Sequence, residues 1–337
     1  MNMKLFIRHL TFIGLLIVIA VPGMYAQNPD SLLLRDYDPE SVYNLPETHI
    51  PRAAYPVIDV HSHDYAANEK EVDQWVRIMD SAGIEKSIIL ATATGAEFDS
   101  IVDRYSAYPD RFDIWCGIDY SGYKTEDWPA GAIEELERCH AMGAKGVGEL
   151  GDKGLGLFYC DPPAYGMHLD DERMKPILQK CAELDMPVNI HVADPYWMYL
   201  PMDAKNDGLM NAWKWKIDTT KENILLHHEL IQTLENAVRE NPNTTFVVCH
   251  FANCSHDLRM LGELLKKYPN LYADISARYA ETATIPRFTQ TFYKKYQDRL
   301  LYGTDMGIGR GVYETTFRIL ESANEHFYPD RFSYHWP

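Results

Sequence analysis

The stretch Tyr55-Pro-Val-Ile-Asp-Val-His-Ser-His63 opens the part of the chain that decides the fold. Its apolar run, 57–60, predicts a strand, and residues 71–82 after it show the spacing of an amphipathic helix. From Tyr55 onward the same unit repeats: a short apolar, β-branched run, a turn, and a longer segment with helical spacing. The runs are apolar throughout, which is typical of strands buried on both faces of a parallel sheet.

Repetition of this unit predicts an α/β protein, and eight units over about 270 residues match the size of a (β/α)8 TIM barrel. The expected strands are 57–60, 87–91, 113–118, 146–148, 188–190, 245–249, 271–274 and 300–302. The expected helices are 71–82, 99–108, 132–142, 172–184, 230–240, 258–268, 287–296 and 313–325. Long loops follow strands 4 and 5, at 149–171 and 191–229, and in a barrel they lie over the mouth. An open, doubly wound sheet is the alternative, although no G-x-G-x-x-G follows the first strand.

The composition is that of a globular protein with a large core. Of 337 residues, 46% are hydrophobic and 24% are charged, which excludes a disordered chain, a collagen-like fibre and a multi-span membrane protein. The net charge of −17 argues against a protein that follows nucleic-acid phosphates, because such proteins carry a basic stripe. We therefore expect a small-molecule partner and no nucleic acid, with a homo-oligomer as an open alternative to a monomer.

The N-terminus has the layout of a secretory signal. Lys4 and Arg8 precede an apolar run at 12–21, and the small residue Ala26 follows. The run is too short to span a bilayer of about 30 Å. We expect a signal peptide at 1–26, an exported protein that is periplasmic or secreted, and no stable membrane anchor after cleavage; an uncleaved anchor is the alternative. Residues 27–54 are polar and rich in proline, as in an N-terminal arm or linker, so the barrel is expected at 55–337.

Metal-competent side chains stand at the ends of four expected strands. His61 and His63 follow strand 1, His191 ends strand 5, His250 ends strand 6 and Asp305 follows strand 8. In a barrel these strand ends meet at one mouth. Imidazole together with carboxylate suits Zn²⁺ or another divalent transition metal. An iron oxygenase with two histidines and one carboxylate fits this larger set less well, and the G-x-S-x-G motif of a serine hydrolase is missing. Most of the six cysteines are expected to be buried small hydrophobic residues.

The segments around these residues resemble the amidohydrolase superfamily. Asp59-Val-His61-Ser-His63, Val188-Asn-Ile-His-Val192, Cys249-His-Phe251 and Leu301-Tyr-Gly-Thr-Asp305 are similar to its amidohydrolase-related branch, which includes aminocarboxymuconate semialdehyde decarboxylase-like enzymes and several lactonases. The resemblance covers residues 55–325. It implies a (β/α)8 barrel and a divalent metal bound by His61, His63, His191 and Asp305, with His250 as a catalytic or supporting residue. Relatives continue into a further segment with a final helix, so we expect either a branch that ends early or a C-terminally incomplete sequence.

Glu149 leaves the number of metal ions open. It follows strand 4, where some members of the superfamily carry a residue that bridges two ions. A ligand or bridge is one interpretation of Glu149, and a solvated or structural carboxylate is the other. We expect one ion rather than two, with Zn²⁺ as the first choice and Mn²⁺ as the alternative.

The expected reaction is hydrolysis of a C–O or C–N bond, lactone- or amide-like, by metal-activated water. Asp305 is the expected general base and His250 the residue that polarises the carbonyl group. Non-oxidative decarboxylation of a cyclic or unsaturated carboxylic acid is the second hypothesis, and a non-catalytic barrel that binds a small molecule is the third. Arg278, Tyr196 and Trp197 are expected to contact a carboxylate-bearing substrate, with Arg278 equally compatible with a structural role.

Overall fold

The computed structural model describes residues 28–33, 36–37 and 42–325. The chain divides into two units, one that reaches to Asn44 and one that starts at Leu45. In the first unit a turn closes where the Ser31 amide donates to the Asn28 carbonyl oxygen (3.0 Å). The expected signal peptide, 1–26, lies outside the described residues. Within the described ranges, no helix combines the length and apolar character that crossing a membrane requires.

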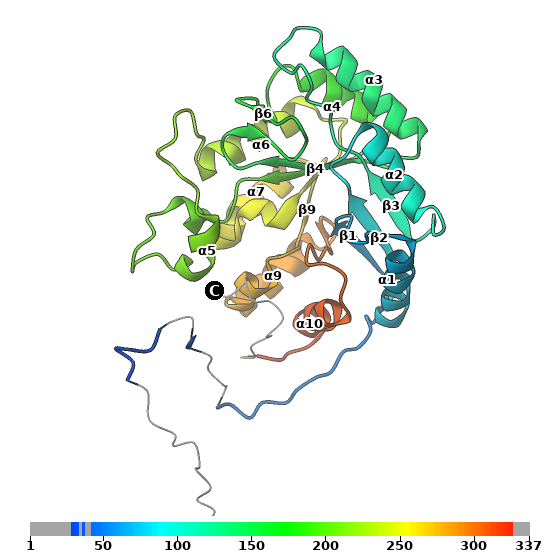
Figure 1. Cartoon of the computed structure of the whole chain (residues 1–337). Helices are drawn as coiled ribbons and strands as arrows, with labels where there is room; N and C mark the ends of the chain where they lie inside the picture. Colours follow the sequence, from blue (N-terminus) through cyan, green and yellow to red (C-terminus); the bar gives the residue numbers. More distant parts are fainter. Residues whose placement is uncertain (1–27, 34–35, 38–41, 326–337) are drawn as a thin grey trace, which may run out of the picture. The chain divides into compact units, whose positions relative to one another are not determined.

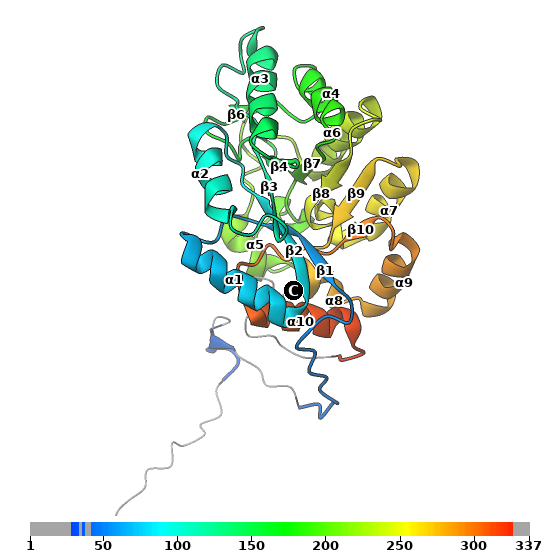
Figure 2. The same cartoon turned by 90° about the vertical axis from the view of Figure 1, so that its right-hand side faces the viewer.

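Eight parallel strands form the centre of the second unit (Figure 2). Their bounds are β1 (Val57–Ser62), β2 (Ile84–Leu90), β3 (Phe112–Trp115), β4 (Val147–Asp152), β7 (Val188–Val192), β8 (Phe246–Val248), β9 (Leu271–Asp274) and β10 (Leu300–Leu301). All eight expected strands are confirmed, with ends that shift by a few residues. They pair in two ladders, β1-β2-β3 and β10-β9-β8-β7-β4, and two short antiparallel strands, β5 (Gly156–Leu157) and β6 (Ala164–Tyr165), extend the second ladder.

Backbone hydrogen bonds join the two ladders at both seams. Between β3 and β4, the Cys116 amide donates to Gly146 (3.0 Å) and the Gly148 amide donates to Cys116 (2.8 Å). Between β1 and β10, the Val60 amide donates to the Tyr302 carbonyl oxygen (2.9 Å). The strands therefore form a ring, and the protein has the expected (β/α)8 barrel fold.

Helices surround this ring (Figure 1). Their bounds are α1 (Glu69–Ala82), α2 (Gly95–Tyr105), α3 (Trp128–Ala141), α4 (Lys175–Glu183), α6 (His227–Glu240), α7 (Leu258–Lys267), α9 (Pro286–Tyr296) and α10 (Arg310–Glu321). Each corresponds to an expected helix. In α1 the Asn68 side chain accepts from the Glu71 amide at the start, and Gly83 ends the helix with a left-handed φ of 83°. Its buried face includes Trp75 and Met79, four residues apart.

The last helix, α10, packs against α1 and against the chain that leads into the barrel. The indole nitrogen of Trp75 donates to the Tyr313 hydroxyl (3.5 Å). The Thr48 amide donates to Asn324 (2.8 Å), just beyond α10, and the Ala54 amide donates to Glu321 (3.1 Å). These contacts hold α10 in place at the end of the segment that carries Asp305.

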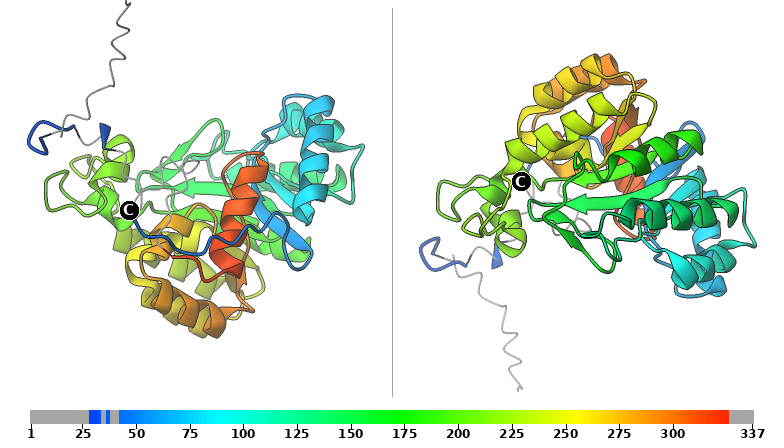
Figure 3. Two further views of the ribbon diagram at one scale, coloured as in Figure 1. Left: turned by 90° about the horizontal axis from the view of Figure 1, so that it is seen from below. Right: turned by 90° about the horizontal axis from the view of Figure 1, so that it is seen from above.

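Both long connections have structure of their own. After β4, the β5–β6 hairpin is held by Asp152, which accepts from the Gly154 amide (2.9 Å) and pairs with His168 (2.7 Å). After β7, the connection forms the short helices η2 (Tyr196–Tyr199) and α5 (Leu209–Trp215), and it projects to one side of the barrel (Figure 3, light green). Three more short helices, η3 (Cys249–Asn253), η4 (Ser255–Asp257) and α8 (Tyr279–Ala283), follow β8 and β9.

Candidate metal centre

Two imidazoles at the end of β1 point their Nε2 atoms into the mouth of the barrel. His63 Nδ1 lies 3.0 Å from the Leu90 carbonyl oxygen, which can only accept, so Nδ1 keeps a proton and Nε2 offers the lone pair when the ring is neutral, as a metal requires. His61 Nδ1 lies 2.9 Å from Asp274 Oδ2 and is oriented in the same way. His61 and His63 are two residues apart in an extended segment, so their side chains point to the same side.

Two carboxylates from distant parts of the chain meet these imidazoles. Asp305 Oδ1 lies 3.2 Å from His63 Nε2 and 3.7 Å from His61 Nε2. Glu149 Oε2, from β4, lies 3.3 Å and 3.7 Å from the same two nitrogen atoms. The strand ends therefore converge, as the sequence predicts for His61, His63 and Asp305, and Glu149, for which the sequence leaves two interpretations open, lies among them.

His250 joins the group from the end of β8. Its Nδ1 lies 3.0 Å from the Ser276 carbonyl oxygen, so its Nε2 is the unprotonated nitrogen of the neutral ring. That Nε2 lies 3.6 Å from Asp305 Oδ2 and 3.9 Å from Glu149 Oε1. Burial, together with the charge of Arg278, lowers the pKa of His250 well below its usual value. His250 is therefore a neutral imidazole with a lone pair facing both carboxylates.

His191 lies beside the group and contacts it through a carboxylate. Its Nδ1 is 2.8 Å from Glu149 Oε1, and its Nε2 is 3.1 Å from Asp194 Oδ1. Asp194 in turn forms an ion pair with Lys153 (3.1 Å). Both ring nitrogens of His191 are thus engaged by carboxylates, and in this arrangement the residue orients Glu149. Its expected role as a metal ligand stays a prediction.

The donor atoms fit a divalent metal ion. Two overlapping sets have ligand atoms within 4.8 Å of one another: His61, His63 and Asp305, and His61, Glu149, Cys249 and His250. His61 Nε2 is buried and has no hydrogen-bond partner among the described residues. An unsatisfied buried polar atom costs about 1–3 kcal/mol, and a bound cation would remove that cost. Imidazole nitrogen and carboxylate oxygen are common ligands of divalent transition metals.

The charges of the two carboxylates suit this role. Burial by itself would raise the pKa of Glu149, but His61 and the hydrogen bond with His191 hold it well below its usual value. Burial also opposes ionisation of Asp305, and His61 and His63 lower its pKa. Although burial lowers the pKa of His63, Asp305 and Glu149 raise it to about 9. Both carboxylates are therefore anionic at neutral pH, as metal ligands must be.

The three expected substrate-binding residues have protein partners of their own. The Arg278 guanidinium is buried, and it donates to Asn253 Oδ1 (3.1 Å from Nε) and to the Ala277 carbonyl oxygen (2.9 Å). Tyr196 stacks on His256 with ring centroids 4.5 Å apart. Trp197 packs against Gly208 so closely that a Cβ there would lie 2.1 Å from the indole ring. Trp197 thus packs within the insertion and Tyr196 packs against η4, and a substrate-binding role for all three residues stays a prediction.

Several residues at the centre are absent from the sequence-based expectations. Asp274 accepts from His61 and from the His250 amide (2.9 Å), and Ser276 contacts both rings. Asp274 is the last residue of an expected strand, so the rule that found the histidines could have found it. Tyr159, on the β5–β6 hairpin, lies edge-on to His191 with ring centroids 5.8 Å apart. Nothing in the sequence pattern indicates its position.

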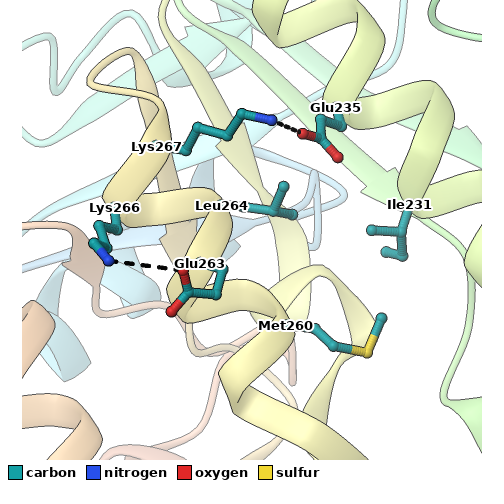
Figure 4. A pocket seen from close by; sticks show the side chains of 7 residues that line it. All are labelled: Ile231, Glu235, Met260, Glu263, Leu264, Lys266 and Lys267. Carbon is teal, nitrogen blue, oxygen red and sulfur yellow. Dashed lines mark hydrogen bonds and ion pairs between the residues drawn. The ribbon is translucent and has the colours of Figure 1, made fainter.

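A separate groove of about 510 Å³ lies on the outside of the barrel between α6 and α7. Figure 4 shows the side chains that line it: Ile231, Glu235, Met260, Glu263, Leu264, Lys266 and Lys267. Two ion pairs, Lys267–Glu235 (2.6 Å) and Lys266–Glu263 (3.9 Å), lie along it. None of its lining residues belongs to the histidine–carboxylate group.

Comparison with known proteins identifies the family. A sequence model of the amidohydrolase family matches residues 49–329. No curated protein matches the chain. A candidate amidohydrolase from Staphylococcus aureus has a similar structure, with a TM-score of 0.54, 14% identity, and coverage of 83% of this chain and 96% of the other.

Two decarboxylases have a similar structure as well. A dihydroxybenzoic acid decarboxylase from Polaromonas, solved with manganese and the inhibitor 2-nitroresorcinol, gives a TM-score of 0.52 at 17% identity, covering 84% of this chain and 95% of the other. A 2,6-dihydroxybenzoate decarboxylase in complex with 2,6-dihydroxybenzoate gives 0.51 at 15% identity, covering 83% and 96%. At such identities these structures show a shared fold. With the family match over most of its length, the chain belongs to the amidohydrolase family of enzymes.

Proposed function

We propose that this protein is a metal-dependent enzyme that removes CO₂ non-oxidatively from a cyclic, hydroxylated carboxylic acid. The convergence of His61, His63 and Asp305, with an Nε2 atom of His61 that has no hydrogen-bond partner among the described residues, is the observation that carries the metal dependence. The similarity to two decarboxylases of dihydroxybenzoic acids supports the type of reaction. Decarboxylation thus takes precedence over the hydrolysis expected from the sequence.

The cation would be held by His61, His63 and Asp305, with Glu149 beside them. When bound, a divalent metal acts as a Lewis acid that polarises substrate oxygens and orients them. We propose one ion as the working state.

Access to the centre is from the side of Asp305 and His63. The Asp305 side chain is 24% exposed and that of His63 is 29% exposed, whereas His61 is 0% and Glu149 5% exposed. Tyr65 stands at the same side, and its hydroxyl donates to Asp305 Oδ1 (3.5 Å). A substrate entering here meets the Asp305 carboxylate first, while the buried residues are closed to solvent.

Asp305 is therefore the group that moves the proton. Its carboxylate takes a proton from a substrate hydroxyl group, which leaves the hydroxyl oxygen anionic. The bond between the ring carbon and the carboxylate breaks, CO₂ leaves, and the electron pair stays on the ring carbon. Asp305 then gives the proton to that carbon, and the anionic hydroxyl oxygen takes up a proton from solvent, so that one proton is consumed overall for each CO₂ released. His250 Nε2, 3.6 Å from Asp305 Oδ2, helps to hold the carboxyl group in place.

Hydrolysis remains the second candidate because the same two residues could serve it. Asp305 is anionic and His250 is a neutral base, so either could accept a proton from an attacking water. Arg278 does not distinguish the two reactions, since its guanidinium is already bonded to Asn253.

A substrate panel on the metal-loaded protein separates these candidates. Dihydroxybenzoates test for CO₂ release, and lactones and amides test for acid release without CO₂. Asp305→Asn should lower CO₂ release by about 10²–10⁴-fold, the usual share of an acid–base group. Asp113→Asn, which alters a partly exposed ion pair with Lys86, is the matched control and should leave it unchanged. Near-native turnover by Asp305→Asn would overturn the role of Asp305, and acid release without CO₂ would replace decarboxylation by hydrolysis.

A further inference from the structure

Cys249 places a buried thiol among the ligand atoms of the metal centre. It is 0% exposed, and its Sγ donates to Asn189 Oδ1 (3.0 Å). Its sulfur, with donor atoms of His61, Glu149 and His250, forms a set in which every pair of atoms lies within 4.8 Å. The set therefore offers two nitrogens, one oxygen and one sulfur to a cation.

The backbone after β8 explains how two adjacent residues face one site. In an extended strand, Cys249 and His250 would point to opposite faces of the sheet. The chain instead turns into the left-handed region, with φ between 52° and 57° from His250 to Asn253. Such a conformation costs of order 1–3 kcal/mol for each residue other than glycine, and it persists where the surroundings enforce it.

Hydrogen bonds hold this turn in place. Asp274 Oδ1 accepts from the His250 amide (2.9 Å), and the Asn253 side chain donates to the Val192 and Ala193 carbonyl oxygens (3.1 Å each). The turn is tied to β9 on one side and to the end of β7 on the other. The structure thus maintains a strained backbone that brings both side chains to the same point.

A role for Cys249 as a small hydrophobic residue does not match its surroundings. Cys254, five residues later and also buried, shows the ordinary case, since its Sγ faces a backbone oxygen, that of Ala252 (3.4 Å). Cys249 instead lies among imidazoles and a carboxylate, where an apolar group has no packing advantage. Its position is that of a ligand.

We propose that Cys249 is a further ligand of the ion that His61 binds, and that its sulfur makes the centre prefer Zn²⁺ to Mn²⁺. This inference rests on the metal dependence proposed above. When the cation binds, the S–H bond breaks, the sulfur keeps the electron pair that it shares with the metal, and the proton leaves to the buffer. Thiolate sulfur selects Zn²⁺, whereas Mn²⁺ favours carboxylate, carbonyl and water oxygens.

X-ray absorption at the zinc edge tests the proposal on the full-length protein loaded with Zn²⁺. We expect one sulfur at about 2.3 Å beside nitrogen and oxygen ligands at about 2.0–2.1 Å in the wild type. Cys249→Ser should lose the sulfur and keep the lighter ligands, while Cys254→Ser, the matched control, should retain it. Loading with Co²⁺ gives a second readout, a thiolate-to-cobalt charge-transfer band that is present in the wild type and in Cys254→Ser and lost in Cys249→Ser.

Metal competition measures the preference. The ratio of Zn²⁺ to Mn²⁺ affinity should fall in Cys249→Ser and stay unchanged in Cys254→Ser. Circular dichroism shows whether Cys249→Ser is folded. If it is not, the presence or absence of zinc-bound sulfur in the X-ray absorption spectra of the wild type and of Cys254→Ser decides whether Cys249 is a ligand. Zinc bound through nitrogen and oxygen alone in the wild type would overturn the role of Cys249 and leave the metal dependence intact. A wild type that binds neither ion would overturn both.

Discussion

Replacing Asp274 by asparagine should weaken metal binding by changing which nitrogen of His61 carries the proton. Asp274 Oδ1 accepts from three groups: the His250 amide (2.9 Å), the Ser276 amide (3.0 Å) and the Ser276 hydroxyl (2.5 Å). Oδ2 faces His61 Nδ1 (2.9 Å). In Asp274→Asn the amide oxygen satisfies the three donors best at the Oδ1 position, which turns the NH₂ group toward His61.

An NH₂ group there needs an acceptor, so His61 Nδ1 loses its proton and Nε2 gains one. Nε2 is the atom that faces His63, Glu149 and Asp305, and a protonated nitrogen cannot bind a metal. Loss of such a supporting carboxylate typically lowers metal affinity about 10–100-fold. At about 1.4 kcal/mol per factor of ten, this is about 1.4–2.8 kcal/mol of binding free energy.

Competition with a chelator measures the dissociation constant of Zn²⁺ for the wild type, Asp274→Asn and the control Asp113→Asn. Nitrogen-15 spectra of labelled histidine report the tautomer of His61 independently of affinity, and thermal melting of the metal-free proteins shows whether the fold is retained. If Asp274→Asn is folded and binds Zn²⁺ with wild-type affinity, Asp274 does not set the orientation and proton of His61, and the reasoning is refuted.

Three further outcomes are expected. Burial lowers the pKa of His168, but the hydrogen bond with Asp152 raises it above its ordinary value. The pair therefore stabilises the fold fully below the ordinary imidazole pKa, and this stabilisation is lost as pH rises through the pKa of the folded state. In urea titrations, the difference in unfolding free energy between wild type and His168→Asn should shrink with increasing pH. Phe317→Ala, at a core position that is 1% exposed, should lower the free energy of unfolding by about 3–5 kcal/mol in denaturant titrations. Trp213→Ala, at a position that is 57% exposed, should change it by no more than about 0.5 kcal/mol. Equal losses of unfolding free energy in the two variants would refute this packing. Removing the metal with a chelator should lower the melting temperature. Compared with protein in metal at 100 times its dissociation constant, the free energy of unfolding should fall by about 2.7 kcal/mol. An unchanged melting curve would contradict metal binding to the folded state.

The barrel was predictable because each layer of the fold leaves its own pattern. Buried parallel strands require short apolar runs, such as 88–91 and 246–248, and the covering helices require an apolar stripe. The ends of these strands also mark the site, since His61, His63 and Asp305 lie next to them and converge as expected. The same rule applied to Asp274 would have added the carboxylate that orients His61.

The remaining features depend on geometry that residue spacing does not encode. The side chain of Cys249 reaches the site because the backbone becomes left-handed at His250, which breaks the alternation of a strand. His191 ends its strand as expected, but Glu149 from β4 and Asp194, three residues further along the chain, take its two nitrogens. Tertiary packing decides which buried polar groups bond to one another. The sequence therefore indicates which side chains can bind a metal, but not which hydrogen bonds they form.

The central claim is that side chains from separate strands bind one divalent cation. Metal content, measured by mass spectrometry on the protein purified and then equilibrated with Zn²⁺ or Mn²⁺, tests it most directly when wild type and His61→Ala are compared. His61 belongs to both sets of ligand atoms, so its removal affects either arrangement. We predict about one ion per chain in the wild type and a large loss in His61→Ala. A wild type without bound metal, or a folded His61→Ala with the same metal content, would contradict the account.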